Sequence, residues 1–367
     1  MPRKIGPSIP AQGWEFWVDR GGTFTDILAR RPDGILIVRK FLSDCPEQYA
    51  DAAAAGIREI LGLSPAEPIP AGTIRTLKMG TTVATNALLE RKGEPTLLAI
   101  TEGFGDALRI GYQNRPKLFD LDILLPDMLY REVAEIRERL SAAGEVVKEL
   151  DVASARAGLQ AGYDRGLRSV AIVLMHGYKF PGHERLLADI ARKIGYRQIS
   201  TSHETSALMK LVSRGDTTVA DAYLTPILQR YVDGVRAEIG QGVRLRFMQS
   251  NGGLADANRF RGKDAILSGP AGGIVGMAKT AAGAGFDRII GFDMGGTSTD
   301  VSHFVGDYER TYETVIAGVR LRAPMMHIHT VAAAEARSAA SMAHAFASVR
   351  SPRGPCRGPH AIAAADR

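Results

Sequence analysis

Alternating apolar and polar positions near the start of the chain predict a buried strand followed by a β-hairpin. Residues 14–18 form a short apolar run that ends at Asp19 and two glycines, the pattern of a strand entering a tight turn. Residues 24–30 alternate apolar and polar side chains, and residues 31–34 (Arg-Pro-Asp-Gly) are a turn signal. Residues 35–41 then predict the returning strand.

Helical spacing alternates with short apolar runs along the rest of the chain. We predict further strands at residues 74–79, 96–101, 169–175, 243–249 and 288–292. We predict helices at residues 44–61, 82–91, 153–166, 217–239 and 271–284. Because Pro226 lies inside the longest helical stretch, we expect that helix to be broken or re-angled there. This order of strands and helices predicts an α/β architecture.

The most informative feature of the chain is an approximate repeat. Residues 18–26 and 292–300 match at an Asp, a Gly-Gly-Thr, a Thr and a closing Asp, and they lie 274 residues apart. The two loops inside the repeat are Asp19-Arg20-Gly21-Gly22-Thr23 and Asp293-Met294-Gly295-Gly296-Thr297. A duplicated βββαβα unit supplies one such hairpin to each of two lobes.

The residue types in these loops suit phosphate binding. Two glycines after a strand let the backbone approach phosphate oxygens, and a following hydroxyl adds a hydrogen bond. A carboxylate at the strand end lies where a hydrated Mg²⁺ binds, since Mg²⁺ prefers few carboxylates together with water and phosphate. One such loop alone is equally compatible with an ordinary tight hairpin. Two copies with the same spacing favour a phosphate clamp.

A second glycine-rich segment, residues 267–273, precedes the predicted helix at residues 271–284. Gly269 and Gly272 belong to it, and a glycine-rich helix start can bind an anion. The alternative is that small residues let two helices cross closely where the lobes hinge. The pattern matches neither a P-loop nor a Rossmann fingerprint.

Residues 14–333 resemble the hydantoinase A/5-oxoprolinase family, within the actin-like ATPase superfamily of sugar kinases, heat-shock chaperones and actin. Besides the phosphate loops, the resemblance rests on residues 79–93, 111–116 (Gly-Tyr-Gln-Asn-Arg-Pro), 248–253 and 267–273. Met79 is a departure, because relatives more often carry His at that position.

The resemblance implies an α/β, two-lobed, actin-like fold and an ATP-dependent hydrolase that opens a cyclic amide by phosphorylating the substrate oxygen. It implies ATP and Mg²⁺ as cofactors and a second, hydantoinase B-type subunit as partner. Two other functions stay open: the ATP-hydrolysing subunit of an acetone or acetophenone carboxylase, and a non-catalytic nucleotide-binding module.

The resemblance also assigns expected roles to individual residues. Asp19 and Asp293 are the expected catalytic residues and hold Mg²⁺ through water. The expected phosphate-binding and other cofactor-binding residues are Gly21, Gly22, Thr23, Gly295, Gly296, Thr297, Gly269 and Gly272. The expected substrate-side residues are Thr81, Thr82, Asn86 and Arg115. For the first three of these, a helix start with ordinary capping is an equal alternative. Arg115 is expected to pair with a substrate carboxylate, although such an Arg is more often a surface or inter-lobe contact.

Two histidines offer a weaker indication of a metal site. His327 and His329 flank Ile328 on an apparent strand, so both side chains are expected on one side. Two histidines without a third ligand more often have a structural role.

We expect four segments: an N-terminal extension at 1–13, a first lobe at 14–200, the start of a second lobe at 201–333 and an aberrant tail at 334–367. The tail is rich in Ala, Arg and Pro and contains no Leu. A natural disordered tail is one interpretation. The other is a frameshift in GC-rich DNA, because plausible codons from Met342 onward, read in a shifted frame, resemble the family's continuation. We therefore expect an incomplete second lobe and impaired ATP turnover.

Composition excludes other classes of protein. The tail holds five arginines against Glu335 and Asp366, which is half of the net charge of +6. The rest of the chain has no Lys/Arg stripe interleaved with aromatics, so we expect no nucleic-acid binding. Because no apolar run approaches about 18 residues, we expect no membrane span. Two cysteines and no signal-like N-terminus favour the cytoplasm.

Overall fold

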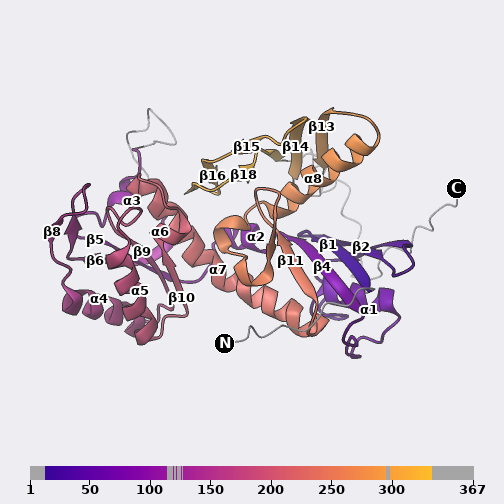
Figure 1. Ribbon diagram of the computed structural model, residues 1–367, viewed down its shortest axis with the longest axis horizontal. Helices are drawn as coiled ribbons and strands as arrows, with labels where there is room; N and C mark the ends of the chain where they lie inside the picture. The colour runs from indigo at the N-terminus through magenta and orange to yellow at the C-terminus, as the bar shows by residue number, and fades with distance from the viewer. Residues whose placement is uncertain are drawn as a thin grey trace, which may run out of the picture.

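The computed structural model describes residues 13–113, 119, 121, 125, 127–294 and 298–332. Several predictions fall outside these residues: the extension before residue 13, Arg115, the loop residues Gly295, Gly296 and Thr297, and the tail with its expected frameshift. Figure 1 shows three bodies, two of them side by side along the longest axis of the molecule and the third above their junction.

The first body is a six-stranded mixed sheet with the order β12-β11-β4-β1-β2-β3. Its strands are β1 (Trp14–Arg20), β2 (Phe24–Arg30), β3 (Leu36–Leu42), β4 (Ile74–Thr81), β11 (Arg244–Met248) and β12 (Leu254–Asp256). The strands β1, β2 and β3 form an antiparallel meander, whereas β4 is parallel to both β1 and β11. The predicted hairpin is confirmed.

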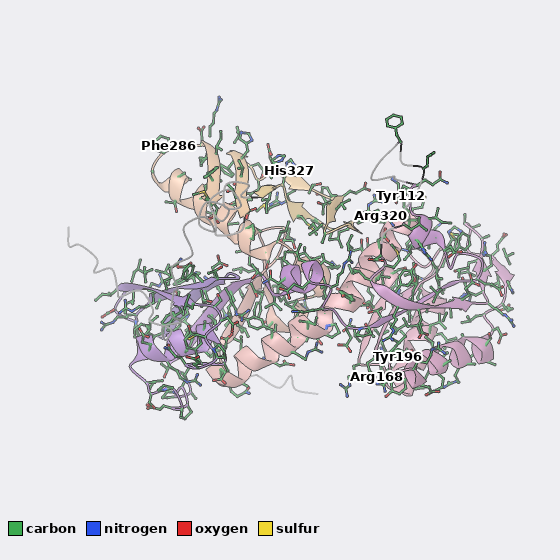
Figure 2. The ribbon with its side chains drawn as sticks, turned by 180° about the vertical axis from the view of Figure 1, so that it is seen from behind. Tyr112, Arg168, Tyr196, Phe286, Arg320 and His327 are labelled. Carbon is green, nitrogen blue, oxygen red and sulfur yellow. The ribbon has the colours of Figure 1, made fainter. Side chains whose placement is uncertain are left out.

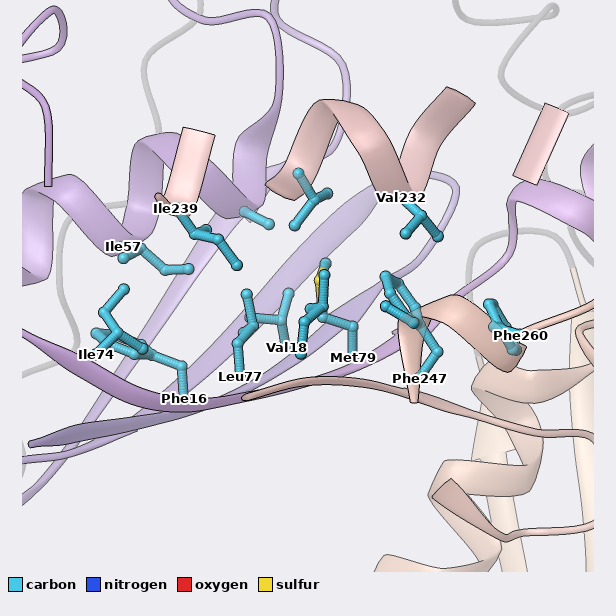
Figure 3. Close-up of a cluster of buried hydrophobic side chains, with 14 of the residues drawn as sticks. Phe16, Val18, Ile57, Ile74, Leu77, Met79, Val232, Ile239, Phe247 and Phe260 are labelled. Atoms are coloured by element: carbon cyan, nitrogen blue, oxygen red, sulfur yellow. The ribbon is translucent and has the colours of Figure 1, made fainter. Parts of the chain in front are cut away.

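The core of this body lies between one face of the sheet and the helices α1 (Ala52–Leu61) and α7 (Leu211–Ile239). Figure 3 shows Phe16, Val18 and Leu77 pointing from the strands toward α7 and α1, from which Ile239 and Ile57 approach. Phe16 and Leu77 are completely buried. Each fully buried side chain of this size stabilises the fold by about 2 kcal/mol through its removal from water.

The second body is a parallel sheet with the order β10-β9-β5-β6. Its strands are β5 (Thr96–Thr101), β6 (Tyr130–Ile136), β9 (Ser169–Val173) and β10 (Gln198–Thr201), with β7 (Arg139–Leu140) and β8 (Val146–Lys148) as a side hairpin. Its helices are α3 (Ala107–Ile110), α4 (Val152–Asp164), α5 (Gly182–Ile194) and α6 (Ser202–Thr205). Every residue of β5 and β9 is buried, as expected for a parallel sheet covered on both faces.

This parallel sheet is inserted, along the chain, between α2 (Val83–Leu89) and β11 of the first sheet. The pairing of β4 with β11 therefore joins residues on both sides of position 200, where we had expected one lobe to end. The six-stranded sheet is a spatial unit that crosses this position.

The third body begins with α8 (Ser268–Gly283) and continues into a three-stranded antiparallel sheet, β13-β14-β19. Its strands are β13 (Arg288–Met294), β14 (Ser298–Val305) and β19 (His329–Ala332). Two small strand pairs extend it: β15 (Arg310–Thr311) with β18 (Met325–Met326), and β16 (Thr314–Ile316) with β17 (Val319–Leu321). Two short 3-10 helices, η1 (Ala257–Arg259) and η2 (Gly262–Asp264), precede α8.

Two helix predictions need correction. The helix predicted from residue 44 begins at Ala52, because the Asp51 side chain accepts a hydrogen bond from the Ala54 N–H at 2.9 Å and caps the helix there. The other concerns Pro226, where we expected the helix to be broken or re-angled: there is no break, and the helix is continuous from Leu211 to Ile239. Among the described residues, no helix is both long enough and apolar enough to cross a membrane.

Candidate functional site

The two repeated segments form hairpins of the same geometry. In the first hairpin Asp19 of β1 pairs with Asp26 of β2. In the second, Asp293 of β13 pairs with Asp300 of β14. Each repeat therefore places its first Asp at the end of the first strand and its closing Asp directly opposite. The sequence match is thus also a match of strand register.

The first loop is held in place by β3 and the residue that follows it. The Gly21 N–H donates to the Phe24 carbonyl at 3.0 Å, which closes the turn. The Ser43 hydroxyl donates to the Gly21 carbonyl at 2.7 Å, and the Ser43 N–H donates to the Thr23 carbonyl at 2.9 Å. These bonds fix the loop while Gly22 and Thr23 remain exposed at its tip. The exposed backbone of the tip is accessible to a ligand.

The Asp19 carboxylate lies where β4 and α8 approach β1. A Cβ at Gly80 of β4 would lie 2.8 Å from Asp19 Oδ1, and a Cβ at Gly269 of α8 would lie 3.6 Å from the same atom. Gly80 is therefore a close approach that a side chain would obstruct. The carboxylate is open to solvent on one side and covered by these backbones on the other.

The pKa of Asp19 is affected by charged residues of both hairpins. Loss of solvent on its inner side is the largest cause that raises the pKa of Asp19, and the negative charges of Asp26 and Asp293 raise this pKa further. Lys40 opposes them and lowers the pKa. Because such interactions weaken with distance, the effect of Asp293 indicates that the two carboxylates lie near enough for their charges to interact.

Helix α8 lies between the two aspartates. Gly269 is next to Asp19, and a Cβ at Gly273 would lie 4.0 Å from Asp293 Oδ2. Residues four apart are neighbours on one face of a helix, so this face presents a glycine to each aspartate. Gly272, also expected in the site, lies beside β11, where a Cβ on it would be 3.7 Å from the Met248 side chain.

Hydrogen bonds join the start of α8 to the end of β4 and to α2. The Leu267 N–H donates to the Thr85 hydroxyl at 3.0 Å, and the Ser268 hydroxyl donates to the Thr81 carbonyl at 2.8 Å. Leu267 has a φ of 59°, a left-handed conformation that is strained for a branched side chain. The helix start is therefore held in a conformation that the local sequence alone disfavours.

The residues expected on the substrate side divide into two groups. The Thr82 N–H and the Thr82 hydroxyl both donate hydrogen bonds to the Arg20 carbonyl, at 3.2 and 3.3 Å. The Asn86 side-chain amide donates to the Thr82 hydroxyl at 3.5 Å. A Cβ at Gly22 would lie 3.9 Å from this Asn86 amide. Thr82 and Asn86 thus line the first glycine loop. Thr81 is completely buried, and its hydroxyl accepts a hydrogen bond from the Val83 N–H at 3.2 Å.

Arg115 lies outside the described residues, but the chain that leads to it contacts the third body. The Arg320 guanidinium is 5.9 Å from the centre of the Tyr112 ring and donates to the Leu108 carbonyl at 2.7 Å. Figure 2 shows Tyr112 and Arg320 close together, where the β16–β17 hairpin approaches α3.

The two histidines of the weaker metal-site indication lie close together. The His327 and His329 rings are 4.4 Å apart, edge to face. The Glu309 carboxylate contacts His303 Nδ1 at 2.8 Å and His327 Nδ1 at 3.5 Å. Hydrogen bonding to these two histidines lowers the pKa of Glu309. Within the part of the chain that the structure describes, no three His, Cys, Asp or Glu side chains are placed to hold a metal ion together.

Sequence reasoning did not identify Gly80 or Gly273 as site residues. Gly80 lies inside the specific segment 79–93, and Gly273 ends the segment 267–273. The spacing of four between Gly269 and Gly273 was the available signal, because it places both on one helix face.

Comparison with known proteins agrees with this geometry. A family described as hydantoinase/oxoprolinase N-terminal region matches residues 15–195, and one described as hydantoinase/oxoprolinase matches residues 214–350. The 5-oxoprolinase 1 of Arabidopsis thaliana is 44% identical over an alignment of 350 positions, which covers 87% of this chain and 28% of the relative. The acetophenone carboxylase gamma subunit of Aromatoleum aromaticum is 30% identical over an alignment of 330 positions, which covers 80% of this chain and 43% of the relative.

The fold has a counterpart of known structure. The crystal structure of an ATP-dependent caprolactamase from Pseudomonas jessenii matches with a TM-score of 0.74 at 29% identity, over 86% of this chain and 48% of that one. This likeness confirms the expected α/β, actin-like ATPase fold. The chain spans less than half the length of each of these relatives.

Proposed function

The chain belongs to the hydantoinase/oxoprolinase family, and on that premise we propose that it supplies the phosphate-binding site of an ATP-dependent hydrolase acting on cyclic amides. The observation that carries the proposal is the placement of Asp19 and Asp293. They end the first strands of two hairpins in the same register, and one helix presents Gly269 and Gly273 to them.

In the proposed site the two glycine loops hold the phosphates of ATP. The first contributes Gly21, Gly22 and Thr23, and the second contributes Gly295, Gly296 and Thr297. Gly269 keeps the start of α8 free of side chains beside them. Backbone N–H groups and a helix start together favour negative charge, so this arrangement supports phosphate binding.

The residues fit a hydrated Mg²⁺. Asp19 and Asp293 bring two carboxylates toward one place, and the charge of Asp293 and burial both disfavour the ionised form of Asp19. Asp19 and Asp293 would hold a divalent cation, which would offset this repulsion and neutralise phosphate charge. They would hold it through water, since Mg²⁺ keeps part of its hydration shell.

The chemistry begins at the amide oxygen of the substrate. This oxygen attacks the γ-phosphorus, the bond from that phosphorus to the bridging oxygen breaks, and ADP leaves. Water then adds to the activated carbon, and the C–N bond breaks as the ring nitrogen takes a proton and leaves as an amine, which gives an acyl phosphate. A second water hydrolyses the acyl phosphate to a carboxylate and inorganic phosphate. The chain's residues contribute by alignment and by fixed charge, the main requirements of phosphoryl transfer.

A cyclic amide is the favoured substrate class. The identity to a 5-oxoprolinase is 44%, against 30% to a subunit of a ketone carboxylase. The second assignment and a non-catalytic nucleotide-binding module are the alternatives. We also propose a second, hydantoinase B-type subunit as partner, which agrees with the subunit names of relatives, and a cytoplasmic location, where ATP is abundant.

Titration of the full chain with ATP in the presence and absence of Mg²⁺ tests the proposal. We expect Mg²⁺-dependent binding that Asp19→Asn and Asp293→Asn each weaken about tenfold or more, equivalent to about 1.4 kcal/mol. Asp233→Asn is the matched control, because Asp233 forms only an exposed ion pair with Arg236 at 3.5 Å. Unchanged affinity in both site variants, with the fold intact, overturns the proposal. A parallel titration with pyrophosphate separates the phosphate contribution from that of adenine.

A further inference from the structure

The helix α8 begins without the side-chain cap that helix starts usually have. Its N-cap residue, Leu267, makes no capping hydrogen bond, and its φ of 59° lies in the left-handed region instead of the extended region typical of this position. A leucine rarely adopts this conformation, because its Cβ is crowded there. Contacts from outside the helix therefore hold the chain in this turn.

Two hydrogen bonds supply these contacts. The Thr85 hydroxyl of α2 accepts from the Leu267 N–H at 3.0 Å, and Thr85 is half-buried. The completely buried Ser268 hydroxyl donates to the Thr81 carbonyl at 2.8 Å. Both bonds bring the start of α8 onto the short stretch 81–85, where β4 ends and α2 begins.

The first turn of α2 also contacts the first glycine loop. The Thr82 N–H and hydroxyl donate to the Arg20 carbonyl, and the Asn86 amide lies beside Gly22. Thr82 and Asn86 are four positions apart and share one face of α2, whereas Thr85 lies about 100° around the helix from Asn86. The same turn of α2 therefore contacts the loop with one face and the start of α8 with the next. Figure 1 shows α2 at the junction of the three bodies.

Gly269 is the residue of α8 that these contacts place beside the first hairpin. A Cβ on Gly269 would lie 3.6 Å from Asp19 Oδ1. In the first turn of α8 the Ser268 N–H donates to the Ala265 carbonyl at 3.3 Å, and Pro270 has no N–H. The Gly269 N–H has no partner among the described residues. It is thus a backbone donor that the start of α8 leaves free next to the Asp19 carboxylate.

We propose that Thr85 is a positioning residue of the phosphate site. Its hydroxyl holds Leu267 in the left-handed turn and thereby fixes the Gly269 backbone beside Asp19. In this role Thr85 acts through the start of α8 and not through a contact of its own with the phosphates. The inference rests on the proposed function, because the site that Thr85 positions is the proposed site for the phosphates of ATP.

A purely structural role for the same hydrogen bond leads to a different expectation. If the Thr85 hydroxyl only stabilises the fold, its loss lowers the free energy of unfolding and leaves the affinity for phosphate unchanged. Position 267 distinguishes the two roles, because Asn adopts the left-handed conformation with less strain than Leu. With Leu267→Asn the turn depends less on Thr85, so this substitution restores phosphate affinity only if Thr85 acts by holding the turn.

Titration of the full chain with ATP and, separately, with pyrophosphate, both in the presence of Mg²⁺, tests the proposal. Thr85→Val removes the hydroxyl and keeps the branched shape, and we expect it to weaken both ligands by the same factor, about tenfold. We expect Thr85→Ser, which keeps a hydroxyl, to stay within about twofold of the wild-type affinity. Thr280→Val is the matched control, since Thr280 is exposed near the other end of α8.

The double variant Thr85→Val with Leu267→Asn completes the test, and we expect it to recover most of the lost affinity. Two results overturn the inference while the wild-type chain binds ATP: wild-type affinity in folded Thr85→Val, or equal losses in Thr85→Val and in the double variant. If the wild-type chain binds neither ATP nor pyrophosphate, the proposed function fails, and the inference with it.

Two further measurements keep the test decisive. Circular dichroism verifies the fold, and hydrogen exchange at the Leu267 amide is expected to be faster in Thr85→Val but not in Thr85→Ser. If Thr85→Val alone does not fold, the double variant is compared with Leu267→Asn. A difference of about tenfold in ATP affinity between these two would overturn the inference, since the turn then needs no support from Thr85.

Discussion

The Ser169 hydroxyl donates a hydrogen bond to the carbonyl of Ala222 at 2.7 Å, and both residues are completely buried. In a regular helix this carbonyl accepts from the N–H of the residue four positions later, which here is Pro226 and has no N–H. The hydroxyl at the start of β9 thus takes the place of the missing donor. This explains why α7 continues through the proline.

We expect Ser169→Ala to lower the free energy of unfolding by about 1–3 kcal/mol, because it leaves a buried carbonyl without a donor. Denaturant unfolding of the full chain, followed by circular dichroism, measures this change. Ser64→Ala is a suitable control, since the Ser64 hydroxyl makes only an exposed contact with Glu67 at 3.3 Å.

The variant Pro226→Ala makes the test specific. It restores an N–H that can bond the Ala222 carbonyl, so Ser169→Ala in this background is expected to cost less than in the wild type. A coupling near zero between the two sites in the double-mutant cycle would contradict this account of the helix.

The sequence pattern predicted the elements that depend on local interactions. Residues 24–30 alternate because one face of β2 is buried, and the Pro-Asp-Gly turn that follows closes the hairpin. The pairing of β4 with β11 was not predictable in this way. Both runs indicate a strand, but periodicity carries no information on which strand lies beside which, and the paired residues Thr76 and Arg244 are 168 positions apart.

The same limit applies to the site. The repeat identified Asp19 and Asp293 as equivalent residues, and the strand register agrees with that equivalence. The closeness of Gly80 to Asp19 depends on how β4 packs beside β1, which no spacing in the sequence specifies. The start of α1 was missed because the capping bond of Asp51 competes with the helical pattern before it.

A second prediction concerns Tyr231 of α7. Its hydroxyl is buried and has no hydrogen-bond partner among the described residues, and burial raises its pKa. The Arg20 guanidinium lies 5.2 Å from the centre of the ring. Removing only the hydroxyl retains this contact and removes an unpaired polar group. We therefore expect Tyr231→Phe to be neutral or to stabilise the chain by up to about 1 kcal/mol.

Thermal unfolding measures the effect of Tyr231→Phe. Tyr231→Leu, which removes the ring, serves as the comparison and is expected to be destabilising, since the cation–π contact and the packing on Phe247 are lost. A loss of stability in Tyr231→Phe comparable to that in Tyr231→Leu would show that the hydroxyl has a partner after all.

A third prediction follows from the ion pair of Asp216 and Arg320. The Arg320 Nε donates to Asp216 Oδ2 at 2.7 Å, but burial outweighs this pairing and raises the pKa of Asp216 from 3.8 to about 6. A folded-state pKa above the unfolded value means that the native chain holds the proton more tightly. The contribution of this group to stability is therefore present below pH 4 and is lost as the pH rises toward and through 6.

This pH effect amounts to about 3 kcal/mol, from a shift of about two units at 1.36 kcal/mol per unit. Denaturant unfolding between pH 4 and 7 measures it, in comparison with Asp216→Asn, which cannot titrate. We expect a shallower loss of stability with rising pH in the variant. Asp307→Asn, at an exposed side chain, is the control. Tyr130, Arg109 and Asp106 also surround the pair, so an unchanged slope in Asp216→Asn would assign the pH effect to those neighbours instead.

The last prediction tests the close approach of β4 to Asp19. A Cβ at Gly80 would lie 2.8 Å from Asp19 Oδ1, a distance at which the carboxylate must move. We expect Gly80→Ala to weaken Mg²⁺-dependent ATP binding about tenfold or more, by displacing the carboxylate from the line between the two loops. Gly276→Ala on α8 provides the control, since the space around it is open among the described residues and a helical Ala is favoured over Gly by about 1 kcal/mol. We expect the control to bind ATP with wild-type affinity and to unfold at a slightly higher temperature. If the Gly80→Ala variant binds ATP with wild-type affinity, the affinity for ATP does not depend on the position of the Asp19 carboxylate.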